Sequence, residues 1–443
     1  MQKEMLFWIW LSEKLGVASR DFCRLIELYD SPYDIFHTEE AELDRIEGIS
    51  PKTAQALADK SLQRATEILD SCERNGIDVL PYGDSRYPTV FYDLKRPPVL
   101  LYCMGQPLQL EKRLLIGIVG PRKMSEYGLK SAYKISYELA SAGAVIVSGM
   151  AAGIDGVSAA AAIAAKGQTV AILGCGLNVV YPKHHKELRN EILKHGTLLS
   201  EYPPDARPNH YHFPIRNRLI AGLSQATVVV EAGIGSGSLI TAKDAIVQGK
   251  DVFALPANVG SLGAEGTNGL LRDGARLLLK TEDILNRYSY SHAESLSLEA
   301  LHRAQQNLRV DMHFLDRLGV IELIGTAAQP KTTEIVPPPR ENQPARTTKS
   351  SKSKKKKTEP TSNEPEKITK ETVEKKSSAS AAALSSLSPI QLAVMEAIPD
   401  EQGITADALA SIGYPYGEIV SALTMLEILG LIQKLPGAIY VKI

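Results

Sequence analysis

The residues best suited to chemistry lie between residues 200 and 224. Two aromatic side chains, Tyr211 and Phe213, come just before an Arg-Asn-Arg tripeptide at 216–218. Aromatic rings stack on nucleobases and guanidinium groups bind phosphate, so this combination suits a strand of nucleic acid. The same residues also fit a structural role, with Phe213 in the core and the arginines in internal salt bridges. The pattern alone leaves both interpretations open.

Three glycine-containing loops could bring backbone amides to such a ligand. In IVGPRKM, a tight turn presents Arg122. In SGMAAGID, residues 148–155, small side chains would let a phosphate or sugar approach the backbone, although Asp155 could simply cap a helix. The run AGIGSGSLITA at 232–242 is a Gly/Ser loop that opens a helix. Similar loops also occur in α/β proteins that bind nothing there.

These loops follow short apolar runs that alternate with helical stretches between about residues 114 and 285. The strand candidates are LLIGIV, AVIVS, TVAIL, TLLSE, TVVVE and VFALP. Runs of this kind indicate parallel strands covered on both faces, so the segment predicts an extended Rossmann-like, doubly wound α/β sheet. Because ligands gather at the carboxyl ends of parallel strands, the loops are expected to meet at one site.

The rest of the chain divides by its composition. Helical spacing over 1–75 predicts a bundle of short helices with a helix-hairpin-helix-like segment, followed by the Rossmann-like domain at 76–290 and a helical extension at 291–328. The run IEGISPKTAQAL at 46–57 resembles a phosphate-binding hairpin, but it also fits plain packing.

The C-terminal part begins with a polar, Lys-rich stretch. Residues 329–384 are rich in Pro, Ser, Thr, Glu and Lys, which predicts a disordered linker, either a simple tether or a weak attractor of phosphates. Three helical stretches and a hairpin at 385–443 predict a winged-helix domain. Its third helix, about 416–429, contains no Lys or Arg, which favours protein contacts over DNA binding.

Composition excludes several classes of protein. The formal net charge of -1 argues against a uniformly basic nucleic-acid binder, so any DNA affinity must come from local clusters. The four cysteines form no CxxC pair with metal-ligand spacing, which predicts reduced thiols and no metal site. The apolar start, LFWIWL, predicts a buried helix rather than a signal peptide. A soluble, cytoplasmic protein without a membrane span is expected.

In their joint order these segments resemble the DNA-processing protein A (DprA/Smf) family over nearly the whole chain. The matching runs are VGPR, SGMAAGID, Tyr181-Pro182, FPIRNRLIAGLS, SGSLITA and GTNGLLRDGA. The resemblance implies a helical, sterile-alpha-motif-like (SAM-like) N-terminal domain, an extended Rossmann domain and a C-terminal winged helix. It also implies a protein without a catalytic residue or cofactor that binds single-stranded DNA in its Rossmann domain and dimerises through that domain. It also implies recruitment of the RecA recombinase and protection of incoming strands during natural transformation and recombination.

Carried over by resemblance, the pocket would use arginines for phosphate, Phe213 as a stacking platform and the Gly/Ser loop as its floor. The residues expected to contact DNA are Gly120, Arg122, Lys123, Gly149, Lys183, His210, Phe213, Arg216, Asn217, Arg218, Ser236, Gly237 and Ser238. The chain departs from the family pattern in having His185 for an Asn, His210 for a Lys, and Pro256-Ala257 for a Pro-Gly. Neutral histidines would weaken a phosphate contact.

Two other functions compete with this one. The architecture also resembles nucleotide phosphoribohydrolases, but these enzymes need an acidic residue just after the glycine loop, where this chain has Leu239, Ile240 and Thr241. Asp155 and Glu231 are acids without a recognisable acid/base partner. A winged-helix transcription regulator is disfavoured by the uncharged third helix.

Overall fold

The computed structural model describes residues 2–107, 110, 112–261, 263–321, 388–399 and parts of 404–442. The chain divides into two compact units, 1–335 and 336–443, which are described separately. The predicted linker at 329–384 lies outside the described residues.

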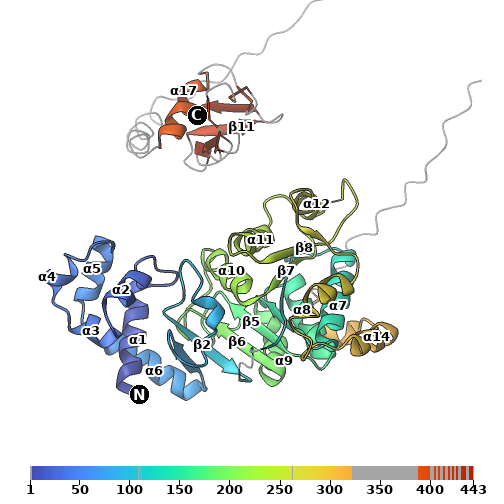
Figure 1. Cartoon of the computed structure of the whole chain (residues 1–443), viewed down its shortest axis with the longest axis horizontal. Coiled ribbons are helices and arrows are strands. Elements are labelled where there is room, and N and C mark those ends of the chain that lie inside the picture. The colour runs from blue at the N-terminus through green and yellow to red at the C-terminus, as the bar shows by residue number, and fades with distance from the viewer. Residues whose placement is uncertain are drawn as a thin grey trace, which may run out of the picture. The chain divides into compact units, whose positions relative to one another are not determined.

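A nine-stranded sheet forms the centre of the larger unit (Figure 1). Its strands are β1 (Asp78–Pro81), β2 (Leu100–Gly105), β3 (Leu115–Val119), β4 (Val145–Ser148), β5 (Thr169–Leu173), β6 (Gly196–Ser200), β7 (Ala226–Val229), β8 (Asp251–Ala254) and β9 (Arg276–Leu277). They lie in the order β1-β2-β6-β5-β4-β3-β7-β8-β9. Neighbours from β6 to β9 in this order are parallel, whereas β1 and β2 form an antiparallel edge.

The sheet confirms the Rossmann-like α/β fold. All six predicted strands form, and the residues of β3 to β7 are buried throughout, as continuous apolar runs require. The outer strands β1 and β9, and β2 next to β1, were not predicted. Both residues of β9 are exposed, so this strand has no apolar pattern to reveal it.

Helices cover both faces of the sheet. They are α7 (Glu126–Ser141), α8 (Ile154–Ala164), α9 (Lys186–His195), α10 (His212–Leu223), α11 (Gly237–Val247), α12 (Glu265–Arg272) and α13 (Glu282–Tyr288). Side chains of α7, α8 and α9 share one core cluster with Ile116 and Ile146, whereas α10 and α11 share another with Leu115 and Val145. Alternate strand residues therefore point to opposite helical layers.

Six helices form the N-terminal part and lie beside β2 (Figure 1). They are α1 (Gln2–Leu15), α2 (Phe22–Leu28), α3 (Pro32–His37), α4 (Glu40–Leu43), α5 (Pro51–Ala58) and α6 (Gln63–Asn75). The apolar start of the chain lies in α1, where Ile9, Trp10 and Leu11 are buried. Among the described residues, no helix is long and apolar enough to span a membrane.

Polar contacts join these helices to the sheet domain, among them a hydrogen bond from Asn178 Nδ2 to Ser71 Oγ at 3.2 Å. The backbone N–H of Ala18 donates to Glu201 Oε1 at 3.1 Å, and Ser71 Oγ donates to Asp205 Oδ2 at 3.2 Å. Behind α7 and α8 the chain continues into α14 (Leu298–Asn307) and α15 (Met312–Arg317). A Cβ placed on Gly156 in α8 would lie 2.8 Å from Val320, so the end of this extension packs directly on α8.

The smaller unit contains α17 (Pro389–Ala397) and a sheet in the order β10-β12-β11. The strands are β10 (Ile404–Thr405), β11 (Ile432–Leu435) and β12 (Ile439–Lys442). Ser388 and Gln391 form a capping box that starts α17. Most of the predicted third helix at 416–429 lies outside the described residues.

Candidate nucleic-acid interface

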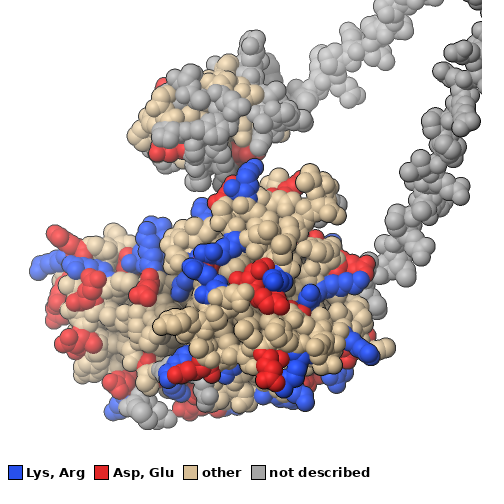
Figure 2. All heavy atoms as spheres, turned by 45° about the vertical axis from the view of Figure 1, so that its right-hand side comes forward, with Lys and Arg blue, Asp and Glu red and all other residues tan. Residues whose placement is uncertain are grey.

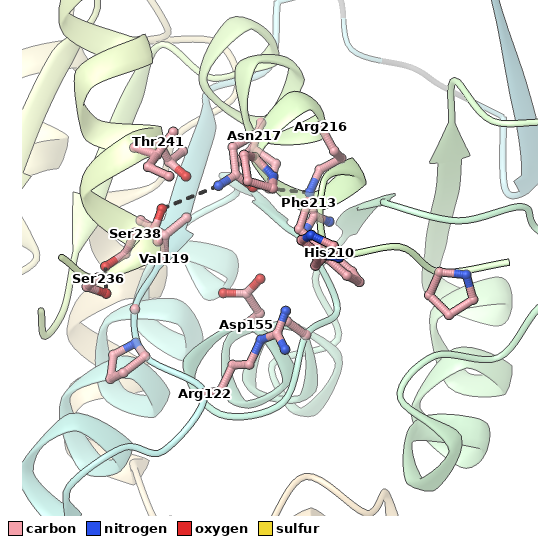
Figure 3. Close-up of a pocket in the computed structure, with 18 of the residues that line it drawn as sticks. Val119, Arg122, Asp155, His210, Phe213, Arg216, Asn217, Ser236, Ser238 and Thr241 are labelled. Carbon is pink, nitrogen blue, oxygen red and sulfur yellow. Dashed lines mark hydrogen bonds between the residues drawn. The ribbon is translucent and has the colours of Figure 1, made fainter. Parts of the chain in front are cut away.

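A cavity of about 520 Å³ opens at the carboxyl ends of β3 and β7. After β3 the chain winds to one side through β4, β5 and β6, and then crosses to the other side of β3 to form β7. Such a reversal leaves a crevice between the two neighbouring strands, which is where ligands bind in open α/β sheets. The loops that sequence analysis singled out meet at this point (Figure 3).

The lining comes from the ends of β3 and β4, the start of α8, the loop after β5, the segment before α10 with the first half of that helix, and the start of α11. It comprises Val119, Gly120, Pro121, Arg122, Ala151, Asp155, Tyr181, Pro208, Asn209, His210, Phe213, Pro214, Arg216, Asn217, Ile220, Ser236, Gly237, Ser238, Ile240 and Thr241. Nine of the thirteen residues expected to contact DNA are among them. The remaining four are Lys123, Gly149, Lys183 and Arg218.

The side chains of Arg122 and Phe213 lie against each other in the cavity. The guanidinium carbon of Arg122 lies 5.0 Å from the centroid of the Phe213 ring, while the ring of Tyr181 lies 5.3 Å from Phe213 at 34°. Phe213 is half-buried, and a Cβ on Gly174 would lie 2.9 Å from it, so the backbone supports the ring. The ring therefore holds an exposed cation at the mouth of the cavity by a cation–π contact.

Arg216 lines the cavity but is fixed within the protein. Its side chain is buried, and it donates through Nη1 to the carbonyl of Gly149 at 2.9 Å and to the carbonyl of Ile172. Its Nε also donates to Asn217 Oδ1 at 3.2 Å. Arg216 thus ties α10 to the ends of β4 and β5, and contributes positive charge from the wall of the cavity.

Asp155 is the one carboxylate among the lining residues. It is 7 % exposed, and its Oδ2 accepts the backbone N–H of Gly149 at 3.1 Å. Burial raises the pKa of Asp155 to about 6, against the opposing effect of Arg216. The N-cap of α8 is Gly153. Asp155 therefore does not occupy the cap position that the sequence suggested; it holds the loop after β4.

The Gly/Ser loop brings backbone amides to the opposite wall. Ser236 precedes α11 without a side-chain cap, and its hydroxyl lies 2.8 Å from that of Ser238. Asn217 Nδ2 donates to the carbonyl of Gly237 at 3.4 Å and joins the loop to α10. The first turn of a helix has free N–H groups and a partial positive charge, so it suits an anion.

Arg218 points away from the cavity. Its Nη2 lies 2.5 Å from Glu201 Oε2, and both side chains are largely buried. The internal salt bridge that the sequence left open is therefore observed for Arg218. Helical spacing gives the reason: Phe213, Arg216, Asn217 and Ile220 follow the i, i+3, i+4, i+7 pattern of one face of α10, which excludes residue 218.

The other three expected residues lie around the cavity rather than in it. Lys123 and Lys183 are exposed beyond the lining, and Gly149 lies behind Arg216, whose guanidinium covers it. A Cβ on Gly149 would lie 2.4 Å from Arg216 Nη1, so the glycine makes room for the buried arginine.

His185 occupies a buried position behind the loop. Its Nδ1 lies 3.1 Å from the carbonyl oxygen of Met150 and therefore donates to it. Met150 has φ 52, a left-handed conformation that costs about 1–3 kcal/mol for a residue other than glycine. Burial lowers the pKa of His185 to about 4. His185 is thus a neutral residue that supports the strained loop, and it does not face a phosphate.

This burial predicts an acid sensitivity. Because the unfolded histidine takes up a proton near pH 6.5 and the folded one near pH 4, the protein should lose about 3 kcal/mol of unfolding free energy as the pH falls to 4, and about 2 kcal/mol of this by pH 5. The variant His185→Asn should lack this loss. Urea unfolding of both proteins at pH 7.5, 6 and 5 measures the difference, and parallel pH profiles would refute the assignment.

The hairpin at 46–57 already has an internal anion. The backbone N–H of Ser50, the N-cap of α5, donates to Asp21 Oδ2 at 3.1 Å, and Thr53 Oγ1 donates to the same oxygen. A carboxylate of the protein thus occupies the place a phosphate would take. The structure favours packing as the role of this hairpin.

Charge elsewhere on the larger unit is mixed. Figure 2 shows Lys and Arg side chains interspersed with Asp and Glu over most of the visible face. Among the described residues, this face therefore has no broad basic surface that would attract DNA. Any selective contact must come from the grouped residues of the cavity.

A nine-stranded Rossmann-like sheet with a cation-bearing cavity at its reversal point defines an α/β ligand-binding protein. Residues 78–289 match the profile of the family described as DNA recombination-mediator protein A. DNA processing protein DprA of Bacillus subtilis is 40% identical over 217 residues, which cover 49% of this chain and 73% of that protein. The Streptococcus pneumoniae DprA is also 40% identical, over 47% of this chain and 73% of its own length.

A solved structure of a relative agrees with this fold. The X-ray structure of DprA from Streptococcus pneumoniae covers 63% of this chain and 97% of that chain, with 31% identity and a TM-score of 0.56. DprA from Helicobacter pylori, described for its mode of binding single-stranded DNA, covers 48% of this chain and 96% of that chain, with 32% identity and a TM-score of 0.44. The chain belongs to the DprA/Smf family.

Proposed function

We propose that this protein binds single-stranded DNA in the cavity, protects the strand and passes it to the RecA recombinase during recombination and natural transformation. Membership of the DNA recombination-mediator family supports this role. The observation that carries the proposal is the exposed Arg122 guanidinium stacked on Phe213 at the cavity mouth. At one place, a cation can bind the phosphate of a nucleotide and an aromatic ring can stack on its base.

Each wall of the cavity has its own task in this proposal. Arg122 and the first turn of α11 bind consecutive phosphates, and Phe213 offers its ring to a base when Arg122 turns toward the strand. Arg216 adds charge without leaving its place, since its hydrogen bonds hold it in the wall. Lys123 and Lys183 would meet the strand only outside the cavity.

Fluorescence anisotropy with labelled single-stranded and duplex oligonucleotides of equal length tests this function. We expect preferential binding of the single strand, with an affinity that falls as salt rises. Equal binding of both forms, or none, would contradict the proposal. An added RecA filament assay, with the strand already coated by single-strand binding protein, tests the transfer step.

A non-enzymatic role agrees with the lining of the cavity. Ile240 and Thr241 follow the glycine loop, where a phosphoribohydrolase would place its acid. Asp155 is present, but among the lining residues it has no second carboxylate to complete an acid/base pair. We therefore place hydrolysis and transcription regulation behind DNA binding, and we propose a cytoplasmic protein that needs no cofactor.

The remaining parts of the chain have proposed roles as well. We assign 1–75 to a SAM-like or helix-hairpin-helix-like domain, 76–290 to the DNA-binding domain, 291–328 to its extension, 329–384 to a linker and 385–443 to a winged helix that contacts protein. The three short strands and α17 support the last assignment. The contacts of Ala18 and Ser71 support a packing role for the first.

The Rossmann domain also offers a surface for a homodimer. In the described part of the chain, β9 is an edge strand that pairs only with β8. Leu277 in β9 is 50% exposed and Leu279, just beyond it, is 70% exposed. Apolar side chains beside an open strand edge are typical of a surface that a second copy covers.

Substituting Leu277 and Leu279 together by Ser should weaken dimerisation by about tenfold or more, because anchor residues near the centre of an interface carry most of its energy. Light scattering coupled to size-exclusion chromatography, over a dilution series, measures the change. Leu28→Ser, at a leucine of α2 about as exposed as Leu277, is the control. A wild-type protein that stays monomeric at every concentration would contradict the dimer.

A further inference from the structure

Asp155 is the lining residue that DNA phosphates do not explain. An ionised carboxylate only accepts hydrogen bonds, and so do phosphate oxygens, so the two repel each other. Yet its carboxylate projects into the cavity, between Arg122 and the wall formed by Asn217 and Ser238 (Figure 3). Besides the cations Arg122 and Arg216, a ligand group that faces Asp155 must donate a hydrogen.

The position of this carboxylate is fixed by the fold. Gly149 donates its N–H to Asp155 and accepts from Arg216 through its carbonyl, so the backbone of one residue holds both charged side chains. Arg216 in turn is held by Ile172 and Asn217. Asp155 is therefore presented to the cavity as a rigid acceptor. Because the side chain is buried and fixed, it can contact only a group that enters the cavity.

An internal segment of a DNA strand has few donors to offer. Its sugar lacks the 2′-hydroxyl and its 3′ and 5′ oxygens are esterified, so every donor lies on a base. Each of the four bases has at least one N–H on its Watson–Crick edge, as in thymine N3–H and guanine N1–H. In a duplex these groups pair with the opposite strand, and only in a single strand are they free.

We propose that Asp155 accepts a hydrogen bond from the Watson–Crick edge of an unpaired base and is thereby a specificity determinant for single strands over duplex DNA. This inference rests on the proposed function of the cavity. Phosphate contacts alone discriminate poorly, since both forms of DNA present phosphates. Because every base has such a donor, the contact would select unpaired DNA without selecting its sequence.

The test compares oligo-dT with the same oligonucleotide built from 3-methylthymine, in which only the N3–H is replaced. At pH 8, where Asp155 is ionised, methylation should weaken binding to the wild-type protein by about tenfold, the typical effect of losing a hydrogen bond to a charged group. In Asp155→Asn the methylation penalty should shrink several-fold, and the preference for single strands over duplex should fall with it.

The double comparison separates this role from simple repulsion. If Asp155 only repels phosphate, Asp155→Asn binds both oligonucleotides more tightly and leaves their ratio unchanged, which overturns the proposal. Glu126→Gln, at an exposed carboxylate of α7 outside the lining, is the charge-matched control and should leave the ratio as in wild type. Because Asn keeps an acceptor for the Gly149 N–H, the variant should fold.

Binding measurements on the wild-type protein alone can also test the role of Asp155. Equal affinity for oligo-dT and its methylated form would overturn the role of Asp155 even if the variant were unstable. Failure of the proposed function looks different: the wild-type protein would then show no salt-dependent preference for oligo-dT over duplex at all.

Discussion

Replacing Arg122 by Ala should weaken single-strand binding by about tenfold to a hundredfold and lower the slope of log affinity against log salt by about 0.7. Arg122 is an exposed cation of the cavity lining that no internal ion pair holds among the described residues. Its guanidinium rests on Phe213, so it can turn to a phosphate without breaking a buried contact. Anisotropy titrations across a salt series measure both quantities.

Lys123→Ala is the matched control for this experiment. It removes the same charge one residue later, from an exposed side chain outside the lining. Its effect on affinity and slope should be several-fold smaller than that of Arg122→Ala. If both variants behave alike, the DNA is attracted by general surface charge and the cavity is not the site.

The fold could be predicted because its strands have an unambiguous pattern. Strands covered by helices on both faces must be apolar at every position, and LLIGIV or TVAIL allow little else. The strand β9 shows the limit of this argument, because two exposed residues that only extend an edge leave no apolar trace.

The site could be predicted as a set of loops but not in its details. Glycine turns at strand ends indicated where a ligand binds, and nine of the expected residues do line one cavity. The separate roles of Arg216 and Arg218 depended on how α10 is rotated about its axis. The sequence could have shown which arginine faces the cavity only if the start of the helix at His212 had been known, because the start fixes which residues share a face.

The sequence analysis interpreted His185 and His210 by comparison with the family, and the structure gives them different roles. His210, which was compared with a Lys of some relatives, lines the cavity, whereas His185 is fully buried and bonded to Met150. Sequence distinguishes these two poorly, because both follow prolines in polar segments. Burial depends on the packing of Val320 and Gly156, which come from distant parts of the chain.

Replacing Arg216 by Ala should have a different signature from Arg122→Ala. The change leaves the Gly149 and Ile172 carbonyls without their donor and Asp155 without its nearest compensating cation. Breaking one partner of a buried charged pair costs about 3–5 kcal/mol, so the melting temperature should fall by about 10 °C. Differential scanning calorimetry measures this loss.

The salt dependence should tell the two arginines apart. Folded Arg216→Ala protein should bind DNA more weakly, because the loop holding Asp155 loses its anchor, yet keep most of the wild-type salt slope, since Arg216 is bonded internally. Adding Asp155→Asn to Arg216→Ala should restore part of the stability, because it removes the uncompensated carboxylate. An undiminished melting temperature with a flattened slope would instead make Arg216 a direct phosphate ligand.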